Sequence, residues 1–370
     1  MTRARDVPGL DLPGEPGPHN AITDVEGVRV GHTTLVHGAG PLVVGTGPIR
    51  TGVTVIVPSE RPAWRTPLFA GCHRLNGNGE LTGLEWVRES GTLTSPIALT
   101  NTHSVGVVRD ALVRVQIRDR DPQELYWSTP VVGETWDGLL NDVNGQHVTA
   151  DHVDAALETA ASGHVAEGAV GGGTGMICHG FKGGIGTSSR IVALPERRHV
   201  VGVLVQANHG RRERFRANGV AVGRYLDAKR VPLPEAPVHG GGSIIVVIAT
   251  DAPLLPHQCE RLAQRAGIGI ARLGAGGEHF SGDLFIAFAT GNGDLPAADY
   301  GAQAPSAVPV TMLVDAHITA LFDAVADATE EAVLNALLAA TTTIGRDGIT
   351  AYGLEAVRLA EALERAKAPA

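Results

Sequence analysis

Five short runs of β-branched and aliphatic residues constrain the fold most, because most of them are too continuously apolar for a half-exposed sheet. An alternating pattern is typical of a strand with one solvent-exposed face, whereas a continuous apolar run predicts a strand covered on both faces. Glycine, proline or asparagine bounds each run, which favours short strands over helices. The predicted strands cover residues 53–57, 97–100, 200–206, 243–250 and 284–289.

Helical spacing separates these strands. One predicted helix has apolar residues at i, i+3, i+4 and i+7, which are Val153, Ala156, Leu157 and Ala160. Thr149, just before them, is a suitable N-cap. Pro256 at a helix start and Gly267 at its stop predict a second helix over 256–266. Apolar faces over 318–325 and 330–340 predict further helices. Buried strands with helices before and after them require stacked sheets covered by helices, which indicates the α/β class.

Charge and composition exclude several classes of protein. The net charge of −9 and the lack of a Lys/Arg run argue against a nucleic-acid partner. No stretch approaches 18 uncharged apolar residues, so we expect no membrane span, and the first residues lack the apolar core of a signal peptide. Three scattered cysteines favour neither disulfides nor structural zinc. Together these features predict a cytoplasmic protein.

The stretch HGGGSIIVVIATDAP, residues 239–253, places three glycines directly before the stiffest predicted strand, with Ser243 at the junction. It ends a segment rich in proline and glycine, 227–242, which we expect to form an exposed joint. One interpretation is a loop in which Ser243 only opens a strand. The other is self-cleavage of the Gly242–Ser243 bond, because glycine reaches the distorted backbone that attack by a neighbouring hydroxyl requires.

Cleavage at this bond would have a chemical consequence. It would leave Ser243 as a new N-terminus that carries a hydroxyl and an α-amine on one residue. An α-amine titrates near ~7.7–8.0 and can accept the hydroxyl's proton. Serine is a weak nucleophile until such a base lies beside it.

Two other stretches carry candidate groups. Ser281 and Asp283 lie two residues apart before a predicted strand, so their side chains point the same way and could relay a proton. Taken alone, a turn with an Asx or serine hydrogen bond is the simpler interpretation of the pair. The stretch GGGTGMICHGFKGGIGTSSR, residues 171–190, is similar to a phosphate-binding loop but does not match its motif. Gly183 follows Lys182, where the motif needs Ser or Thr. Cys178 and His179 are adjacent and could suggest a thiol nucleophile with its base. Adjacent residues on a strand face opposite ways, so these two side chains could not pair. No histidine pair has metal-binding spacing, so we expect no metal site.

Nine stretches in series resemble the DmpA/BapA-type aminopeptidases, the L-aminopeptidase/D-amidase-esterases and β-aminopeptidases that cut themselves before a serine. Each stretch alone is a weak signal, but together they span nearly the whole chain. They are residues 20–32, 75–86, 100–111, 140–149, 173–190, 205–212, 241–254, 281–290 and 335–348.

This resemblance implies a four-layer α/β/β/α sandwich, similar in layering to the N-terminal-nucleophile hydrolases but connected differently. It implies one layered domain over 1–370 that is cleaved into an α chain, 1–242, and a β chain, 243–370. It also implies a homotetramer of αβ units without metal or organic cofactor. The expected substrates are small peptides, amino-acid amides or esters.

The resemblance also assigns roles to residues. The nucleophile falls on Ser243, and its partner pair falls on Ser281 and Asp283, where some members carry Glu in place of Asp. Asn208 falls on the amide that holds the oxyanion, and Glu134 on the acid that binds the substrate's ammonium group. Two residues further on, Trp136 replaces an expected tyrosine or asparagine, which implies a more apolar pocket.

These features predict an autoprocessing serine aminopeptidase or amidase that works through an acyl-enzyme on Ser243. Two alternatives stay open. An acyltransferase of related fold would use the same acyl-enzyme and pass the acyl group to an amine. A non-catalytic homologue would remain a single uncut chain.

Overall fold

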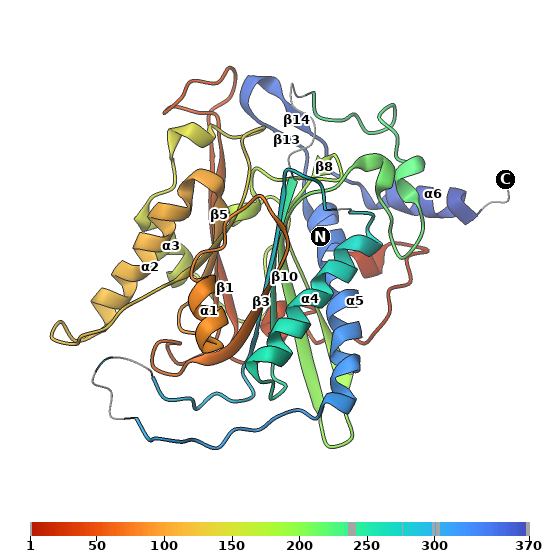
Figure 1. Ribbon diagram of the computed structural model, residues 1–370. Helices are drawn as coiled ribbons and strands as arrows, with labels where there is room; N and C mark the ends of the chain where they lie inside the picture. The colour runs from red at the N-terminus through yellow and green to blue at the C-terminus, as the bar shows by residue number, and fades with distance from the viewer. Residues whose placement is uncertain (1, 236–241, 276, 298–299, 301–303, 368–370) are drawn as a thin grey trace.

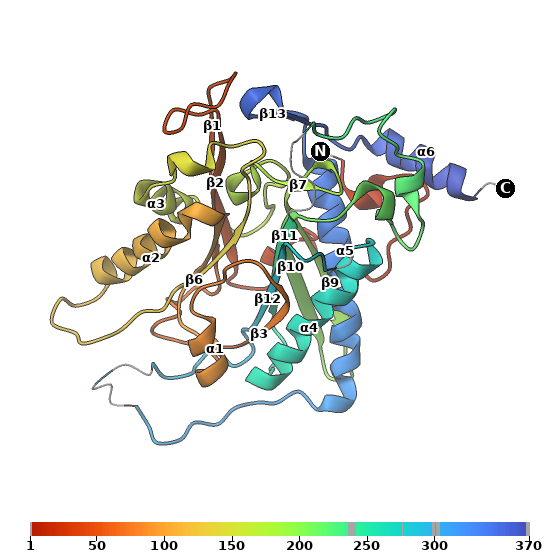
Figure 2. The ribbon, with the colours of Figure 1, turned by 45° about the horizontal axis from the view of Figure 1, so that its top comes forward.

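The computed structural model describes residues 2–235, 242–275, 277–297, 300 and 304–367. Within these ranges, two large β-sheets stack face to face, and helices cover both outer faces (Figures 1 and 2). The smaller sheet has the order β1 (Arg29–His37), β2 (Ile49–Val57), β5 (Ile97–Asn101) and β6 (Val131–Thr135). The larger sheet has the order β4 (Thr92–Leu93), β3 (Leu68–Gly77), β12 (Ser281–Ala289), β11 (Gly242–Thr250), β10 (Arg198–Asn208) and β9 (Gly184–Ala193).

The helices divide between the two sheets. Two helices, α2 (Val105–Asp119) and α3 (Ala150–Glu158), pack on the smaller sheet. Two others, α4 (Pro256–Arg272) and α5 (Ile318–Ala339), pack on the larger one. A short helix, α1 (Leu84–Ser90), contacts β3, and α6 (Ala356–Lys367) lies near the C-terminus (Figure 1). Two small hairpins complete the fold: β7 (Ile177–Cys178) with β8 (Phe181–Lys182), and β13 (Thr343–Ile344) with β14 (Thr350–Ala351).

The surroundings of strand β11 explain why its sequence is continuously apolar from Ile244 to Ala249. Its residues alternate between two cores: Ile244 and Val246 pack toward α4 and α5, whereas Ile245 and Val247 pack between the two sheets. A third core lies between the smaller sheet and its helices. Because both faces of β11 are buried, every position from Ile244 to Ala249 is apolar. The predicted α/β/β/α layering is therefore confirmed, and each of the five predicted strands is present.

Two predicted helix boundaries are wrong. The helix that starts at Pro256 continues through Gly267 to Arg272. A second glycine in this helix, Gly269, allows close packing against α5, because a Cβ at that position would lie 2.6 Å from the Thr329 Cβ. The separate apolar faces over 318–325 and 330–340 belong to one continuous helix, α5. Helical spacing alone does not show where one helix ends when the next turn is also apolar.

The joint predicted over 227–242 lies only partly within the described residues. Most of residues 227–235 are exposed, as expected, although Val231 is buried. Residues 236–241, which include Gly240 and Gly241, lie outside the described ranges. None of the helices in those ranges combines the length and hydrophobicity that a membrane span requires.

The contact between β9 and α5 gives a stability prediction. A Cβ at Gly186 would lie 1.9 Å from the Ala332 carbonyl oxygen, so Gly186→Ala forces the helix off the sheet. Overpacking of this kind costs about 1–3 kcal/mol or more. The matched control is Gly106→Ala in α2, where a Cβ meets nothing within 4 Å and alanine should be neutral or stabilising by up to about 1 kcal/mol. Urea denaturation checks both variants, and equal midpoints would contradict this description of the packing.

Candidate active site

Ser243 lies near the amino end of β11, in the centre of the larger sheet. Its register partners are Asn208 on antiparallel β10 and Gly282 on parallel β12. The side chain is only 3% exposed, and its hydroxyl oxygen has no hydrogen-bond partner among the described residues. A buried polar group without a partner costs stability, and such groups concentrate where function requires them.

Ser281 and Asp283 point the same way from the start of β12, as their spacing predicts. The Ser281 hydroxyl donates to Asp283 Oδ1 at 2.7 Å, and both residues are buried. Burial raises the pKa of the Asp283 carboxyl, and the hydrogen bond from Ser281 acts in the opposite direction. A Cβ placed at Gly242 would lie 3.6 Å from the Ser281 hydroxyl oxygen. The pair therefore lies beside the backbone that precedes Ser243.

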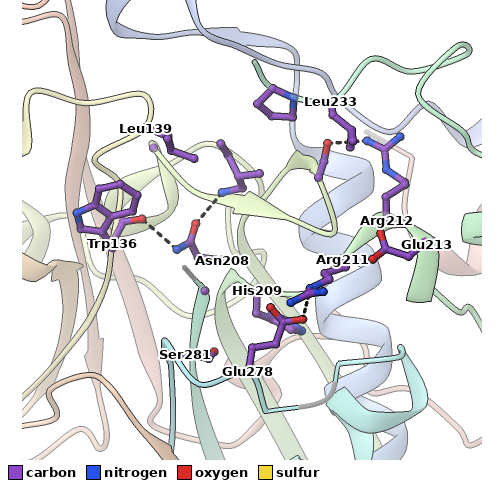
Figure 3. A pocket seen from close by; sticks show the side chains of 16 residues that line it. Trp136, Leu139, Asn208, His209, Arg211, Arg212, Glu213, Leu233, Glu278 and Ser281 are labelled. Atoms are coloured by element: carbon purple, nitrogen blue, oxygen red, sulfur yellow. Dashed lines mark hydrogen bonds and ion pairs between the residues drawn. The ribbon is translucent and has the colours of Figure 1, made fainter. Parts of the chain in front are cut away.

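The side-chain amide of Asn208 is held at both ends (Figure 3). Its Oδ1 accepts from the Ile177 backbone N–H at 2.8 Å, and its Nδ2 donates to the Trp136 carbonyl oxygen at 3.0 Å. An amide NH₂ group carries two hydrogens, so one N–H remains for another acceptor. The two bonds fix the direction of that N–H at the end of β10.

Glu134 lies at the end of β6, in the sheet that faces β11. The carboxylate is 3% exposed and accepts from the Glu80 backbone N–H at 3.0 Å and from the Thr102 hydroxyl. Burial raises its pKa, and the two hydrogen bonds oppose that shift. A Cβ at Gly79 would lie 3.1 Å from both Glu134 Oε1 and Gly282 Cα. Gly79 therefore lies close to both the carboxylate and Gly282, the register partner of Ser243.

A cavity of about 400 Å³ adjoins these residues. Trp136, Asn208, Gly242 and Ser281 line it, whereas Ser243, Asp283 and Glu134 are not among the lining residues. One part of the wall is apolar, with Trp136, Leu139, Ile177 and Leu233, and Figure 3 shows a charged part that includes Arg211, Arg212 and Glu278. Gly242, which directly precedes Ser243 in the chain, is thus one of the residues that line the cavity.

Three further residues near the cavity carry charges that sequence patterns did not single out for this site. Arg211 pairs with Glu278 at 2.5 Å, and Glu278 lies near enough to raise the pKa of Asp283. The Lys182 ammonium group is fully buried and donates to the carbonyl oxygens of Gly173, Met176 and Gly183. Burial lowers its pKa to about 7. A lysine inside a glycine-rich stretch is a sequence signal for a buried ammonium group. Its acceptors could not be predicted, because they are backbone carbonyl oxygens and leave no pattern in the sequence.

Cys178 also has a partner that its neighbours in sequence do not indicate. Its Sγ lies 3.8 Å from Nδ1 of His209, a residue on the neighbouring segment. His179 does not continue the strand, because it has φ of +49° and forms the turn between β7 and β8. Burial raises the pKa of the Cys178 thiol to about 12, so it is not a thiolate nucleophile at neutral pH.

The raised pKa of Asp283 gives a pH prediction. The folded state holds this proton more tightly than the unfolded state, so Asp283 favours folding at low pH and opposes it as pH rises through the folded-state pKa. Asp283→Asn keeps an oxygen that accepts from Ser281 and removes the titration. We expect this variant to gain stability relative to the parent as pH rises from about pH 4, where an unfolded aspartate titrates, to neutral pH. Chemical denaturation across that range checks it, with exposed Asp294→Asn as control, and a pH-independent difference would contradict it.

Comparison with known proteins agrees with this geometry. The sequence profile of peptidase family S58 matches residues 20–351. The chain is 46% identical to beta-peptidyl aminopeptidase BapA of Sphingosinicella microcystinivorans, over 98% of this chain and 92% of that protein.

Solved structures give the same result. The beta-aminopeptidase of a Burkholderia species superposes with a TM-score of 0.92 at 55% identity, over the full length of both chains. The L-aminopeptidase D-Ala-esterase/amidase of Ochrobactrum anthropi, described as a prototype of the serine aminopeptidases and a variant of the Ntn-hydrolase fold, superposes with a TM-score of 0.89 at 42% identity, over 99% of both chains. The chain therefore belongs to peptidase family S58 and is a serine aminopeptidase with this variant of the Ntn-hydrolase fold.

Proposed function

We propose that Ser243 is the nucleophile of this aminopeptidase and that the chain exposes it by cutting its own Gly242–Ser243 bond. The observation that carries the proposal is the buried Ser243 hydroxyl, which has no partner among the described residues although it lies at the centre of the sheet. The products would be the α chain, 1–242, and the β chain, 243–370, which stay together in one layered domain.

Self-cleavage proceeds through an ester. The Ser243 oxygen attacks the Gly242 carbonyl carbon, the C–N bond breaks, and the nitrogen takes the proton as the new α-amine. Water then hydrolyses the ester and releases the Gly242 carboxylate and the free Ser243 hydroxyl. Gly242 suits this step because a Cβ there would approach the Asn208 carbonyl oxygen and His209 Cα, both at 3.3 Å. The hydroxyl of Ser281, beside Gly242, is the nearest group to transfer the proton.

Substrate hydrolysis repeats this chemistry between molecules. The Ser243 hydroxyl attacks the carbonyl after the substrate's N-terminal residue, and the Ser243 amine or the Ser281–Asp283 pair accepts the proton. The remaining N–H of Asn208, together with backbone N–H groups, stabilises the oxyanion. The leaving amine takes the proton, and water then releases the acyl group.

Glu134 would supply the requirement for a free amino end. A buried carboxylate beside the nucleophile pairs with an ammonium group more strongly than a solvated one does. Trp136, at the cavity wall, would contact the apolar part of the substrate's first residue or of its leaving group. Its carbonyl also holds Asn208, so this residue links recognition to oxyanion binding.

The names of the similar proteins support a substrate class. Two relatives, at 46% and 55% identity, are a beta-peptidyl aminopeptidase and a beta-aminopeptidase, and we therefore propose peptides and amides with an N-terminal β-amino acid. The experiment compares p-nitroanilides of β-alanine, L-alanine and D-alanine with the purified enzyme. We expect kcat/KM to be at least about tenfold higher for the β-amino acid, because pocket contacts worth about 1.4 kcal/mol give that ratio. Faster cleavage of L-alanine would contradict the proposed class.

The acyltransferase alternative predicts a different product. With hydroxylamine or a second amine present, an acyltransferase would form mainly the conjugate, whereas a hydrolase forms mainly the free acid. We propose hydrolysis in a homotetramer of αβ units in the cytoplasm. Light scattering of the purified enzyme would test the tetramer directly.

A further inference from the structure

Three buried side chains form a cluster beside the cavity. They are Cys178 at the end of β7, His179 in the following turn, and His209 after β10, and one ligand atom of each lies within 4.8 Å of the others. An ion held at about 2.0 Å by nitrogen and about 2.3 Å by sulfur brings its ligand atoms to about 3.5 Å from one another. The separation of 3.8 Å between Cys178 Sγ and His209 Nδ1 is already close to that value.

One imidazole nitrogen of each histidine in this cluster lacks a protein partner. Nε2 of His179 and Nε2 of His209 are buried and make no hydrogen bond within the described residues. Nδ1 of His179 lies 3.3 Å from the Arg211 carbonyl oxygen. A histidine that donates one N–H to a carbonyl keeps its other nitrogen as a lone pair, which is the usual arrangement of a metal ligand.

The surrounding charges restrict the kind of ion. The Lys182 ammonium lies close enough to affect the Cys178 thiol, and the Arg212 guanidinium donates to the His179 carbonyl oxygen at 2.9 Å. The Glu213 carboxylate acts on His179 from the other side, and Asp137 acts on Lys182. A monovalent ion that replaces the thiol proton leaves the local charge unchanged, since Cys–SH and M⁺ give Cys–S–M and H⁺. A divalent ion would add a positive charge beside two buried cations.

We propose that Cys178, His179 and His209 form a binding site for a soft monovalent cation, with Cu(I) as the biological ion and Ag(I) as a redox-inert probe. Thiolate and imidazole are the ligands that such ions prefer. His209, Gly180 and Gly210 line the cavity, which provides a path for entry (Figure 3).

Binding would affect the enzyme, an effect that rests on the proposed function. Cys178 follows Ile177 and His209 follows Asn208, and Ile177 and Asn208 are joined by the hydrogen bond that orients the proposed oxyanion amide. Closure of the cluster by about 1 Å around an ion moves both ends of that bond. The account therefore predicts that the ion inhibits hydrolysis, and a displacement of this size can cost about 10²-fold in rate.

The test is a titration of the purified full chain with Ag(I) in chloride-free buffer, followed by calorimetry and X-ray absorption. We expect one tight site per chain with one sulfur and two nitrogen ligands, and one proton released per ion. Cys178→Ala should abolish the site. The double variant Cys72→Ala/Cys259→Ala is the matched control, because it removes the other two buried thiols and should retain it.

His179→Phe is a second variant, because phenylalanine preserves the ring packing against Phe215. It should weaken Ag(I) binding at least about 100-fold while the protein remains folded in a thermal unfolding scan. Loss of binding in the double variant, full binding in Cys178→Ala, or Zn(II) binding as tight as Ag(I) would overturn the proposal. Binding without inhibition would refute only the link to Asn208, and binding to an enzyme that fails to hydrolyse amides would separate this site from the proposed function.

Discussion

Replacement of Ser243 by alanine is expected to leave the chain uncut and inactive. The variant lacks the only hydroxyl that the account places on the Gly242 carbonyl, and it would also have no nucleophile for substrates. Removal of a nucleophilic serine typically lowers kcat by 10⁴-fold or more. Intact mass would show a single chain near 38.4 kDa, and hydrolysis of an amino-acid p-nitroanilide would fall to background.

The matched control is Ser243→Thr, which keeps a hydroxyl at the same position. It should still cut itself, more slowly, because the β-branch restricts the side-chain rotamer. Because β11 is buried on both faces, thermal unfolding of each variant must be compared with that of the parent protein. A folded Ser243→Ala chain that is cleaved after residue 242, or that retains activity, would contradict the assignment.

Glu134→Gln should separate substrate recognition from self-cleavage. Glutamine keeps the shape and an oxygen for the Glu80 N–H, but it loses the negative charge that the substrate ammonium would pair with. Loss of one partner of a buried charge pair costs about 2–5 kcal/mol, so kcat/KM should fall by roughly 10²–10³-fold. The chain should still process itself, because self-cleavage involves no ammonium group.

Two comparisons make this result specific. Glu80→Gln changes the neighbouring exposed carboxylate and should leave kcat/KM within about twofold, since exposed charges contribute little. A substrate whose amine is acetylated should be cleaved poorly by the parent and no worse by the variant. If Glu134→Gln blocked processing or lowered the rates of both substrates equally, the residue would be structural and would not bind the amine.

The strands could be predicted from the sequence because burial on both faces leaves a continuous apolar run, as in β11. What such a run cannot reveal is which core each residue joins: Ile244 and Ile245 are equally apolar yet face different layers. The stop predicted at Gly267 failed for a related reason. Glycine ends a helix when its backbone turns left-handed, but in α4 the glycines at 267 and 269 remain helical, and Gly269 permits the close approach of α5.

The candidate site divides in the same way. Ser243 was found from its junction between glycines and a strand, and the Ser281–Asp283 pair from its spacing of two on one strand. Asn208 and Glu134 were assigned only through the resemblance, because β10 and β6 bring them to Ser243 from different sheets. The Cys178–His209 contact joins residues 31 apart in the chain and has no local pattern, so neither histidine spacing nor the resemblance pointed to it.

Intact mass spectrometry of the freshly purified, denatured wild-type protein tests the central claim most directly. The account predicts two species, of 242 and 128 residues, with serine at the amino end of the smaller one. A serine-directed acylating reagent should add mass to that smaller species alone. A single 38.4 kDa chain that hydrolyses amino-acid amides would contradict the account, because activity would then not require a liberated Ser243.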